Sequence, residues 1–254
     1  MPLSEAELNQ LQVITQALDI HAQRNPQDAA LYYINDQDER EQLTYGDLQS
    51  QAQFLAQLLL KNTNPGDRIL LIFPPGLEFV VAFFACAYAG RISVPSYPPA
   101  NRALIEKLQS IIEDAKPSVI VTSHEIHKKL KKLSIIKKIA RFLPINKLLF
   151  YILGKHAEQL NWDVEKLRLI SHLPNKINNT HHLSFPTSDT SSIVFLQYTS
   201  GSTGQPKGVI NTHANLLHNI QLIIKAYGIH PDSIGVSWLP PYHDMGLIGH
   251  IILP

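Results

Sequence analysis

Short apolar runs alternate with helical patterns along this chain, and this alternation limits the folds open to it. The candidate strands are residues 29–34, 69–73, 92–94, 119–122, 167–170 and 193–196. Helical spacing of apolar residues is found in residues 8–18, 43–60, 76–89 and 101–115, and again from Thr212 onward. Strands that are apolar on both faces are typical of parallel sheets covered by helices on both sides. The sequence therefore predicts an α/β fold, layered αβα, with a largely parallel sheet.

The balance of charge excludes some classes of partner. Lysine and arginine number 22 and aspartate and glutamate 21, so no overall positive charge attracts nucleic acid. Cys86 is the only cysteine, which rules out an internal disulfide bond and favours a reducing compartment. Because it lies in the apolar run of residues 82–87, we expect Cys86 to be buried packing rather than a nucleophile.

The N-terminal residues favour a soluble cytoplasmic protein. Glu5 and Glu7 stand where a signal peptide would be basic, and Ser4 with Glu7 forms the pattern of a capping box that opens a helix. The longest nearly uncharged apolar run, residues 79–90, is too short to span a bilayer, which needs about 20 residues.

A run rich in glycine and hydroxyl side chains is the clearest functional feature. Residues 198–209 read Tyr-Thr-Ser-Gly-Ser-Thr-Gly-Gln-Pro-Lys-Gly-Val. An apolar run precedes them and a helical pattern follows, so we expect a strand, a loop and then a helix. Glycines let backbone N–H groups converge on one point, and hydroxyls add donors, which favours a bound polyphosphate over a plain linker. The run is not a Walker A motif, because Pro206 and Gly208 stand where that motif needs glycine and a hydroxyl residue.

This run resembles the phosphate-binding motif of the adenylate-forming (AMP-binding, acyl-CoA synthetase-like) superfamily. With Phe195, Leu196 and Gln197 in front of it, the string is most similar to that of the fatty acyl-AMP ligases. A second block resembles the next motif of the family, in residues 237–249, Ser-Trp-Leu-Pro-Pro-Tyr-His-Asp-Met-Gly-Leu-Ile-Gly. Further similar blocks are residues 73–79 and 89–99, and more weakly residues 43–48. The blocks keep the family order and span residues 29–254.

The resemblance implies a reaction in which a fatty acid carboxylate and ATP give acyl-adenylate and pyrophosphate, with Mg²⁺ as a cofactor. It implies phosphate binding by Thr199, Ser200, Gly201, Ser202, Thr203, Gly204 and Lys207. Thr203 would also act in catalysis and help to hold Mg²⁺, while Lys207 would neutralise charge or pin the loop to a neighbouring acid. It implies that His243 is catalytic and orients the carboxylate, and that the acyl pocket includes Trp238, His243, Asp244 and Met245. Trp238 and Met245 could equally be core, and we interpret His213 as structural. The implied partners are the fatty acid and an acyl carrier protein.

The resemblance also implies that residues 1–254 are the N-terminal portion of an AMP-binding domain. The later family motifs and the C-terminal lid domain would lie beyond Pro254, so we expect the chain alone to be incomplete for catalysis. Two alternatives stay open. One is a long-chain acyl-CoA ligase of the same superfamily, and the other is a truncated chain that binds nucleotide without turnover.

Two further segments have weaker interpretations. Residues 128–141 hold seven basic side chains and no acidic one: Lys128, Lys129, Lys131, Lys132, Lys137, Lys138 and Arg141. This pattern is typical of a solvated helix covering the sheet, or of a basic helix in weak contact with an anionic membrane. The polar stretch of residues 174–190 predicts a loop, and its His181 and His182 lack further ligands at the spacing of a metal site.

Overall fold

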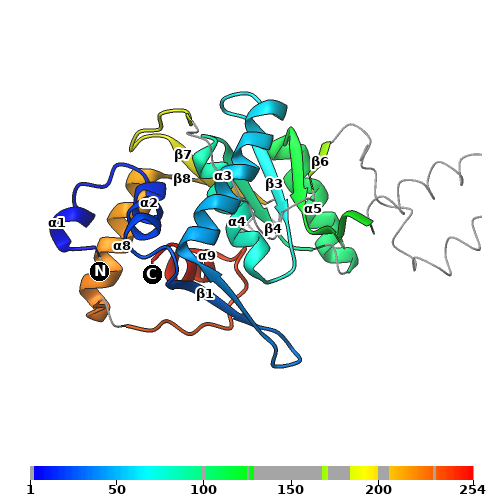
Figure 1. Ribbon diagram of the computed structural model, residues 1–254. Helices are drawn as coiled ribbons and strands as arrows, with labels where there is room; N and C mark the ends of the chain where they lie inside the picture. Colours follow the sequence, from blue (N-terminus) through cyan, green and yellow to red (C-terminus); the bar gives the residue numbers. More distant parts are fainter. Residues whose placement is uncertain are drawn as a thin grey trace, which may run out of the picture.

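A six-stranded sheet organises the part of the chain that the structure describes (Figure 1). The structure is a computed structural model that describes residues 3–98, 101–124, 126–128, 168–170, 184–199, 206–230 and 233–253. The strand order is β6-β5-β3-β4-β7-β8. In chain order these strands are β3 (Arg68–Ile72), β4 (Ile92–Ser96), β5 (Val119–Thr122), β6 (Arg168–Ile170), β7 (Ile193–Thr199) and β8 (Lys207–Thr212). The first five pair in parallel and β8 is antiparallel to β7, which confirms the predicted, largely parallel α/β fold.

Helices cover both faces of this sheet. On one face lie α2 (Ile14–Arg24), α3 (Tyr45–Asn62) and α4 (Leu77–Tyr88), and on the other lies α5 (Arg102–Ala115). Neighbouring residues of β3 divide between the two cores. Ile69 and Leu71 pack with α3 and α4, whereas Leu70 and Ile72 pack with α5. Because each side chain meets a helical layer, the strand has no polar face, which explains its unbroken apolar sequence.

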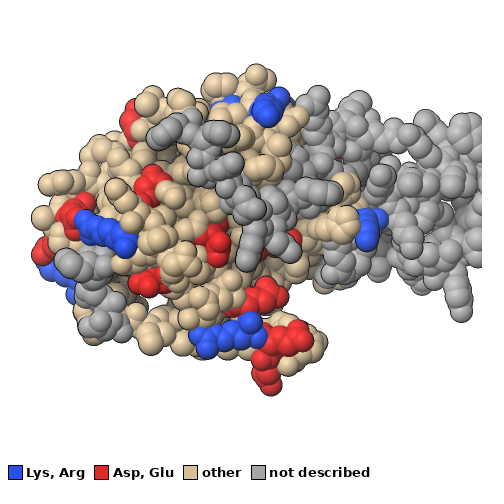
Figure 2. All heavy atoms as spheres, in the orientation of Figure 1, with Lys and Arg blue, Asp and Glu red and all other residues tan. Residues whose placement is uncertain are grey.

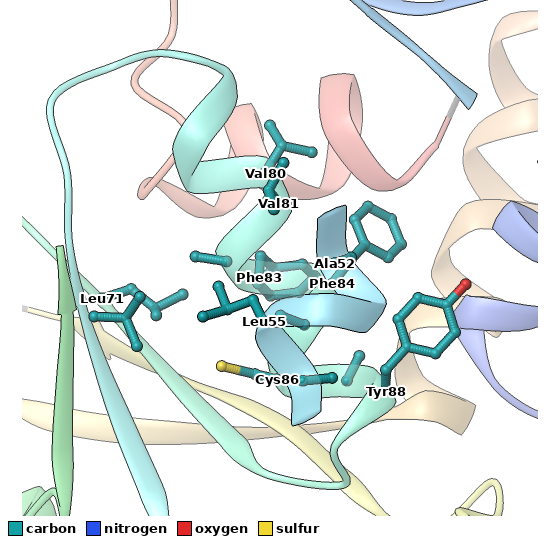
Figure 3. Packing of buried hydrophobic residues seen from close by; sticks show 14 of the residues in the cluster. Ala52, Leu55, Leu71, Val80, Val81, Phe83, Phe84, Cys86 and Tyr88 are labelled. Atoms are coloured by element: carbon teal, nitrogen blue, oxygen red, sulfur yellow. The ribbon is translucent and has the colours of Figure 1, made fainter. Parts of the chain in front are cut away.

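The larger core is built around α4, where every residue from Phe79 to Tyr88 is buried (Figure 3). The ring of Phe83 lies 6.4 Å from that of Phe79 and 5.8 Å from that of Phe195 on β7, centroid to centroid. Cys86 is fully buried in this cluster, and burial raises the pKa of its thiol. The interpretation of Cys86 as packing is therefore confirmed.

The N-terminal helices differ from the single helix predicted over residues 8–18. The structure has α1 (Glu5–Leu8), with the expected capping box of Ser4 and Glu7, and a separate α2 that begins at Ile14. The side-chain oxygen of Gln16 accepts hydrogen bonds from the N–H groups of Gln12 and Val13, at 2.7 and 3.2 Å. These bonds fix a new helix start inside the continuous apolar spacing, so the one-helix prediction was wrong.

A projecting hairpin of β1 (Ala29–Ile34) and β2 (Arg40–Thr44) precedes α3 (Figure 1). Only β1 was predicted, because the first residues of β2 are polar and exposed. The helix predicted from residue 43 begins at Tyr45 instead. The Oγ1 of Thr44 accepts the N–H of Asp47 at 3.1 Å and caps the helix.

The expected strand, loop and helix around the glycine-rich run need a correction. An additional strand, β8, stands between the loop and α8 (His213–Tyr227). It pairs with β7 from Thr199↔Lys207 to Ile193↔Thr212, so the run connects the two strands of a β-hairpin. The helix start itself is confirmed, since Thr212 Oγ1 accepts the N–H of Asn215 at 3.2 Å. The positive end of the α8 dipole therefore lies one strand away from the run.

Two predicted segments fall largely outside the described residues. Of the basic residues 128–141 only Lys128 is described, and His181 with His182 also falls outside. Residues 184–190, the described end of the predicted loop, form no helix or strand. In the part of the chain that the structure covers, no helix has the length and apolar character to cross a bilayer. On the face shown in Figure 2, acidic and basic side chains are interspersed.

Candidate functional site

The hairpin of β7 and β8 holds both ends of the glycine-rich run. Thr199 ends β7 and pairs with Lys207, which begins β8. Because β7 is parallel to β3, β4 and β5, Thr199 lies at the edge where all these strands end. The predicted phosphate-binding residues Ser200, Gly201, Ser202, Thr203 and Gly204 lie outside the described residues. Lys207 is exposed and forms no ion pair within the described part of the chain.

The second motif folds as a tight turn followed by a short helix. The N–H of His243 donates to the oxygen of Pro240 at 3.0 Å, which closes a β-turn with Pro241 at its second position. The helix α9 (Asp244–Leu247) begins directly after His243 and continues into a π-helix (Ile248–Ile252). Gly246 packs against this turn so closely that a Cβ there would lie 2.3 Å from the oxygen of Pro240. The close packing of this turn against α9 therefore depends on glycine at position 246.

The side chains of His243 and Asp244 form a pair at the start of α9. The Nδ1 of His243 lies 2.6 Å from Asp244 Oδ1, and the two side chains are 48% and 51% exposed. A carboxylate that accepts the Nδ1 proton fixes the imidazole so that Nε2 points away from it. Asp244 also accepts the N–H of Met245 at 2.8 Å. His243 is thus held by the turn and by Asp244, and its ring remains accessible.

The two motifs meet where β4 and β7 end. The Nε2 of Gln197 on β7 donates to the backbone oxygen of Tyr242 at 3.4 Å. The ring of Tyr242 lies 4.8 Å from that of Tyr97, the residue after β4, and burial raises the pKa of Tyr242. Lys107 of α5 places its Nζ 4.7 Å from the centre of the Tyr97 ring. These contacts bring the His243 turn to the hairpin, 45 residues apart in sequence.

The predicted acyl-pocket residues are not gathered into a closed pocket by the described residues. The side chain of Trp238 is 91% exposed and that of Met245 is 64% exposed. Their alternative interpretation as core is therefore wrong for the described part of the chain, and their role in a pocket stays a prediction.

A hollow that the sequence did not indicate lies beside the ends of β3 and β5. It has a volume of about 380 Å³ and is lined by Pro74, Glu78, Ser123, His124 and Lys128. Burial, together with the charge of Glu41, raises the pKa of Glu78. Its residues come from two separate stretches of sequence, residues 74–78 and 123–128, without a common motif, so only the folded topology brings them together.

The described residues contain no group of three His, Cys, Asp or Glu side chains that could hold a metal ion. Thr203, the predicted Mg²⁺ ligand, is outside them. Mg²⁺ in proteins is usually held by one or two carboxylates together with substrate phosphates.

Comparison with known proteins identifies the family. The AMP-binding enzyme family matches residues 18–254. The chain belongs to this family. Among curated AMP-binding relatives, the medium-chain-fatty-acid–[acyl-carrier-protein] ligase JamA of Moorena producens is 34% identical over 87% of this chain and 34% of its own length. A long-chain-fatty-acid–AMP ligase of Mycolicibacterium smegmatis is 32% identical over 84% of this chain and 30% of its own.

Solved structures of AMP-binding enzymes agree with this assignment. The fatty acid AMP ligase of Legionella pneumophila superposes with a TM-score of 0.77 at 33% identity, over 99% of this chain and 39% of that one. The same values apply to the L. pneumophila fatty acyl-adenylate ligase solved with acyl adenylate and pyrophosphate. The chain spans about a third of the length of the curated relatives it matches. The comparisons give no support to a membrane contact of residues 128–141.

Proposed function

We propose that this chain supplies the phosphate-binding hairpin and the carboxylate-orienting histidine of a fatty acyl-AMP ligase. The observation that carries the proposal is the hydrogen bond from Gln197 to the oxygen of Tyr242. It joins the phosphate-binding motif to the turn that presents His243, so a nucleotide on one and a carboxylate on the other would meet at one edge of the sheet. Two relatives that are 34% and 32% identical are named as fatty acid ligases, which supports the choice of substrate.

In the proposed reaction a carboxylate oxygen of the fatty acid attacks the α-phosphorus of ATP. The P–O bond to the β-phosphate breaks, and pyrophosphate leaves with the electron pair. Two anions must be brought together, so the protein contributes mainly by positioning and by stabilising charge. Backbone N–H groups and hydroxyls of residues 199–204 would donate to the phosphates, where charge grows on the leaving pyrophosphate.

Lys207 would add a positive charge at the same end of the hairpin. The sequence left two roles open for Lys207, which are charge neutralisation and an ion pair that pins the loop. Its exposure, and the lack of an ion pair within the described residues, favour charge neutralisation. An ammonium at this position would offset the negative charge of the phosphates.

His243 would orient the fatty carboxylate through Nε2. With Nδ1 turned to Asp244, Nε2 faces away from it and is the ring nitrogen that can meet the substrate. Through Nε2, the imidazole would hold the incoming carboxylate in place beside the phosphates. Trp238 and Met245 would border the acyl chain.

The same proposal also assigns the cofactors, the acceptor of the acyl group and the location of the protein. ATP would enter with Mg²⁺ on its phosphates, with Thr203 as a further ligand. The acyl group would pass to an acyl carrier protein, the acceptor in the name of the JamA ligase. We expect a cytoplasmic location from the single cysteine, which favours a reducing compartment.

A second candidate function, that of a fatty acid–CoA ligase, is favoured by one relative. A protein named as a putative fatty-acid–CoA ligase in Mycobacterium tuberculosis is 33% identical over 90% of this chain. The described residues do not separate the two products, since both classes form the acyl-adenylate first.

The test is dodecanoate-dependent exchange of labelled pyrophosphate into ATP, with products identified by mass spectrometry with and without CoA. It is run on the chain alone and on the chain with any sequence that follows it in its gene. Acyl-adenylate as the final product supports the proposal, and acyl-CoA favours the second candidate. Binding of MgATP without exchange in either preparation would favour a non-catalytic nucleotide-binding protein. His243→Ala should abolish most of the exchange, whereas His218→Ala, an exposed histidine of α8, should not.

A further inference from the structure

Tyr198 connects the hairpin to a helix on the opposite side of the sheet from α4. It is the second-last residue of β7, is 4% exposed, and packs in the core cluster of α5. Its hydroxyl donates to Asp114 Oδ2 on α5 at 2.5 Å. Burial and this bond raise the pKa of Tyr198, so the phenol stays protonated and acts as the donor.

The same ring lies across the partner strand. Tyr198 pairs with Gly208 of β8, and a Cβ at Gly208 would lie 3.0 Å from Cζ of Tyr198 and 3.2 Å from its hydroxyl oxygen. Gly208 is followed by Val209, and Lys207 precedes it at the end of the run. The glycine therefore lets an aromatic side chain from β7 cover β8 directly beside the phosphate-binding turn.

The end of α5 that carries Asp114 is itself fixed. Arg68 of β3 donates from Nε to the oxygen of Ala115, the last residue of α5. The next residue, Lys116, has a left-handed backbone with φ of 47° and donates its N–H to the oxygen of Ile112, which ends the helix. Leu108 and Ile111 bury the apolar side of α5 against the sheet. Asp114 thus offers Tyr198 an acceptor at a defined place.

We propose that Tyr198, held by Asp114 and seated on Gly208, is a positioning residue that fixes the β7–β8 hairpin in the orientation needed to bind the phosphates of ATP. This inference rests on the proposed function, which assigns phosphate binding to the turn of that hairpin. A hydrogen bond one residue from the turn end of the hairpin limits its movement, so Thr199 and Lys207 stay aimed at one point. Without it, part of the binding free energy would be spent on ordering the hairpin.

The chain contains a matched pair for comparison. The hydroxyl of Tyr88 on α4 donates to Asp19 Oδ1 on α2, also at 2.5 Å, and Tyr88 is 6% exposed. This second tyrosine–aspartate bond joins two helices and touches neither strand of the hairpin. Tyr88→Phe therefore removes the same kind of bond with a similar loss of stability and serves as the control for Tyr198→Phe.

The experiment measures the affinity of the chain for pyrophosphate and MgATP by calorimetry, and amide hydrogen exchange over residues 193–212. We expect Tyr198→Phe to raise both Kd values about tenfold, the result if the binding-competent hairpin falls to about a tenth of the population. Exchange in β8 should become faster. Asp114→Asn keeps an oxygen acceptor and should bind nearly as wild type, whereas Asp114→Ala should match Tyr198→Phe. Tyr88→Phe should lower the melting temperature without changing either Kd.

Unchanged Kd values in Tyr198→Phe, with wild type binding normally, would overturn this inference and leave the proposed function standing. Equal weakening in Tyr88→Phe would also overturn it, because the effect would then be one of general stability. If the wild-type chain binds neither pyrophosphate nor MgATP while it is folded, the proposed function fails and the inference falls with it.

Discussion

His213 links the two ends of the described chain and makes its stability depend on pH. It is the first residue of α8 and is 2% exposed. Its Nδ1 accepts the N–H of Ile14, the first residue of α2, at 3.1 Å, although 199 positions separate the two. The first N–H groups of a helix have no partner within it, so this imidazole does for α2 what a capping side chain would do. The structural role predicted for His213 is confirmed.

The bond requires a neutral ring, because a protonated Nδ1 cannot accept. Burial lowers the pKa of His213 from 6.5 to about 4, against a small opposing effect of Asp189. The unfolded chain therefore binds the proton first as the pH falls. The contribution of neutral His213 to the free energy of unfolding is fully present above pH 6.5, its pKa in the unfolded chain. This contribution is lost as the pH falls from 6.5 to about 4, its pKa in the folded chain. Stability should fall by about 1.4 kcal/mol per pH unit in this window, or about 2.5 kcal/mol in all between about pH 7 and pH 4.5.

The assay compares urea unfolding of wild type and His213→Asn from about pH 7 to pH 4.5. Asparagine places an oxygen acceptor close to the position of Nδ1 and does not titrate. It should cost some stability at every pH, but the loss on acidification should be about 2.5 kcal/mol smaller than in wild type.

The contributions of other titrating groups to the pH dependence of stability are equal in the two proteins, so they cancel in this comparison. His21, whose pKa is lowered mainly by burial, contributes equally to both proteins. His218→Asn, at an exposed position of α8, should keep the wild-type pH dependence. Parallel curves for wild type and His213→Asn would refute the reasoning, since they would mean that His213 titrates alike in the folded and unfolded chain.

Three further predictions concern tightly packed positions. Gly246→Ala should destabilise the chain by about 3 kcal/mol in urea unfolding, because its Cβ would meet the Pro240 oxygen, whereas Gly249→Ala, with no atom within 4 Å, should be nearly neutral. Gly208→Ala should cost about 1–3 kcal/mol in the same assay, since the hydrogen-bonded Tyr198 has little room to move, and a neutral result would contradict that packing. Cys86 should resist iodoacetamide in the folded chain and react once the chain is unfolded, as followed by mass spectrometry. If the folded chain were labelled as fast as an accessible thiol, Cys86 would not be buried.

The sequence was a good guide wherever one force decides the structure. The strands β3 and β5 are buried on both faces, so their apolar runs were enough to locate them to within a residue or two. Helix starts with a hydroxyl cap, at Thr44 and Thr212, were also predicted closely, because the cap acts within three residues. In these cases the information is local, and it agrees with the tertiary packing.

Elements that depend on distant partners were missed. The strand β2 is polar and exposed, and it exists because β1 pairs with it. The strand β8 has a burial pattern without clear alternation and is held by its ladder with β7. Likewise the break between α1 and α2 comes from Gln16, and the buried acceptor for Ile14 comes from the far end of the chain. The spacing of apolar residues within a short window of sequence does not reveal such strands, helix breaks or distant hydrogen bonds.

The candidate site shows the same division and explains which half of it can be tested on this chain. Residue types and their order were enough to name His243 and the glycine-rich run, but not to show that they meet through Gln197 and Tyr242. The acyl side is different, because eight of the ten exposed large apolar side chains of the described residues lie between Val209 and Met245. Three of them, Ile234, Val236 and Trp238, alternate with small residues in a segment that forms no helix or strand. Trp238 is thus open in the described part of the chain, whereas the His243 turn and the hairpin are joined by a contact within it. Binding of phosphate is therefore the first property to test on these residues.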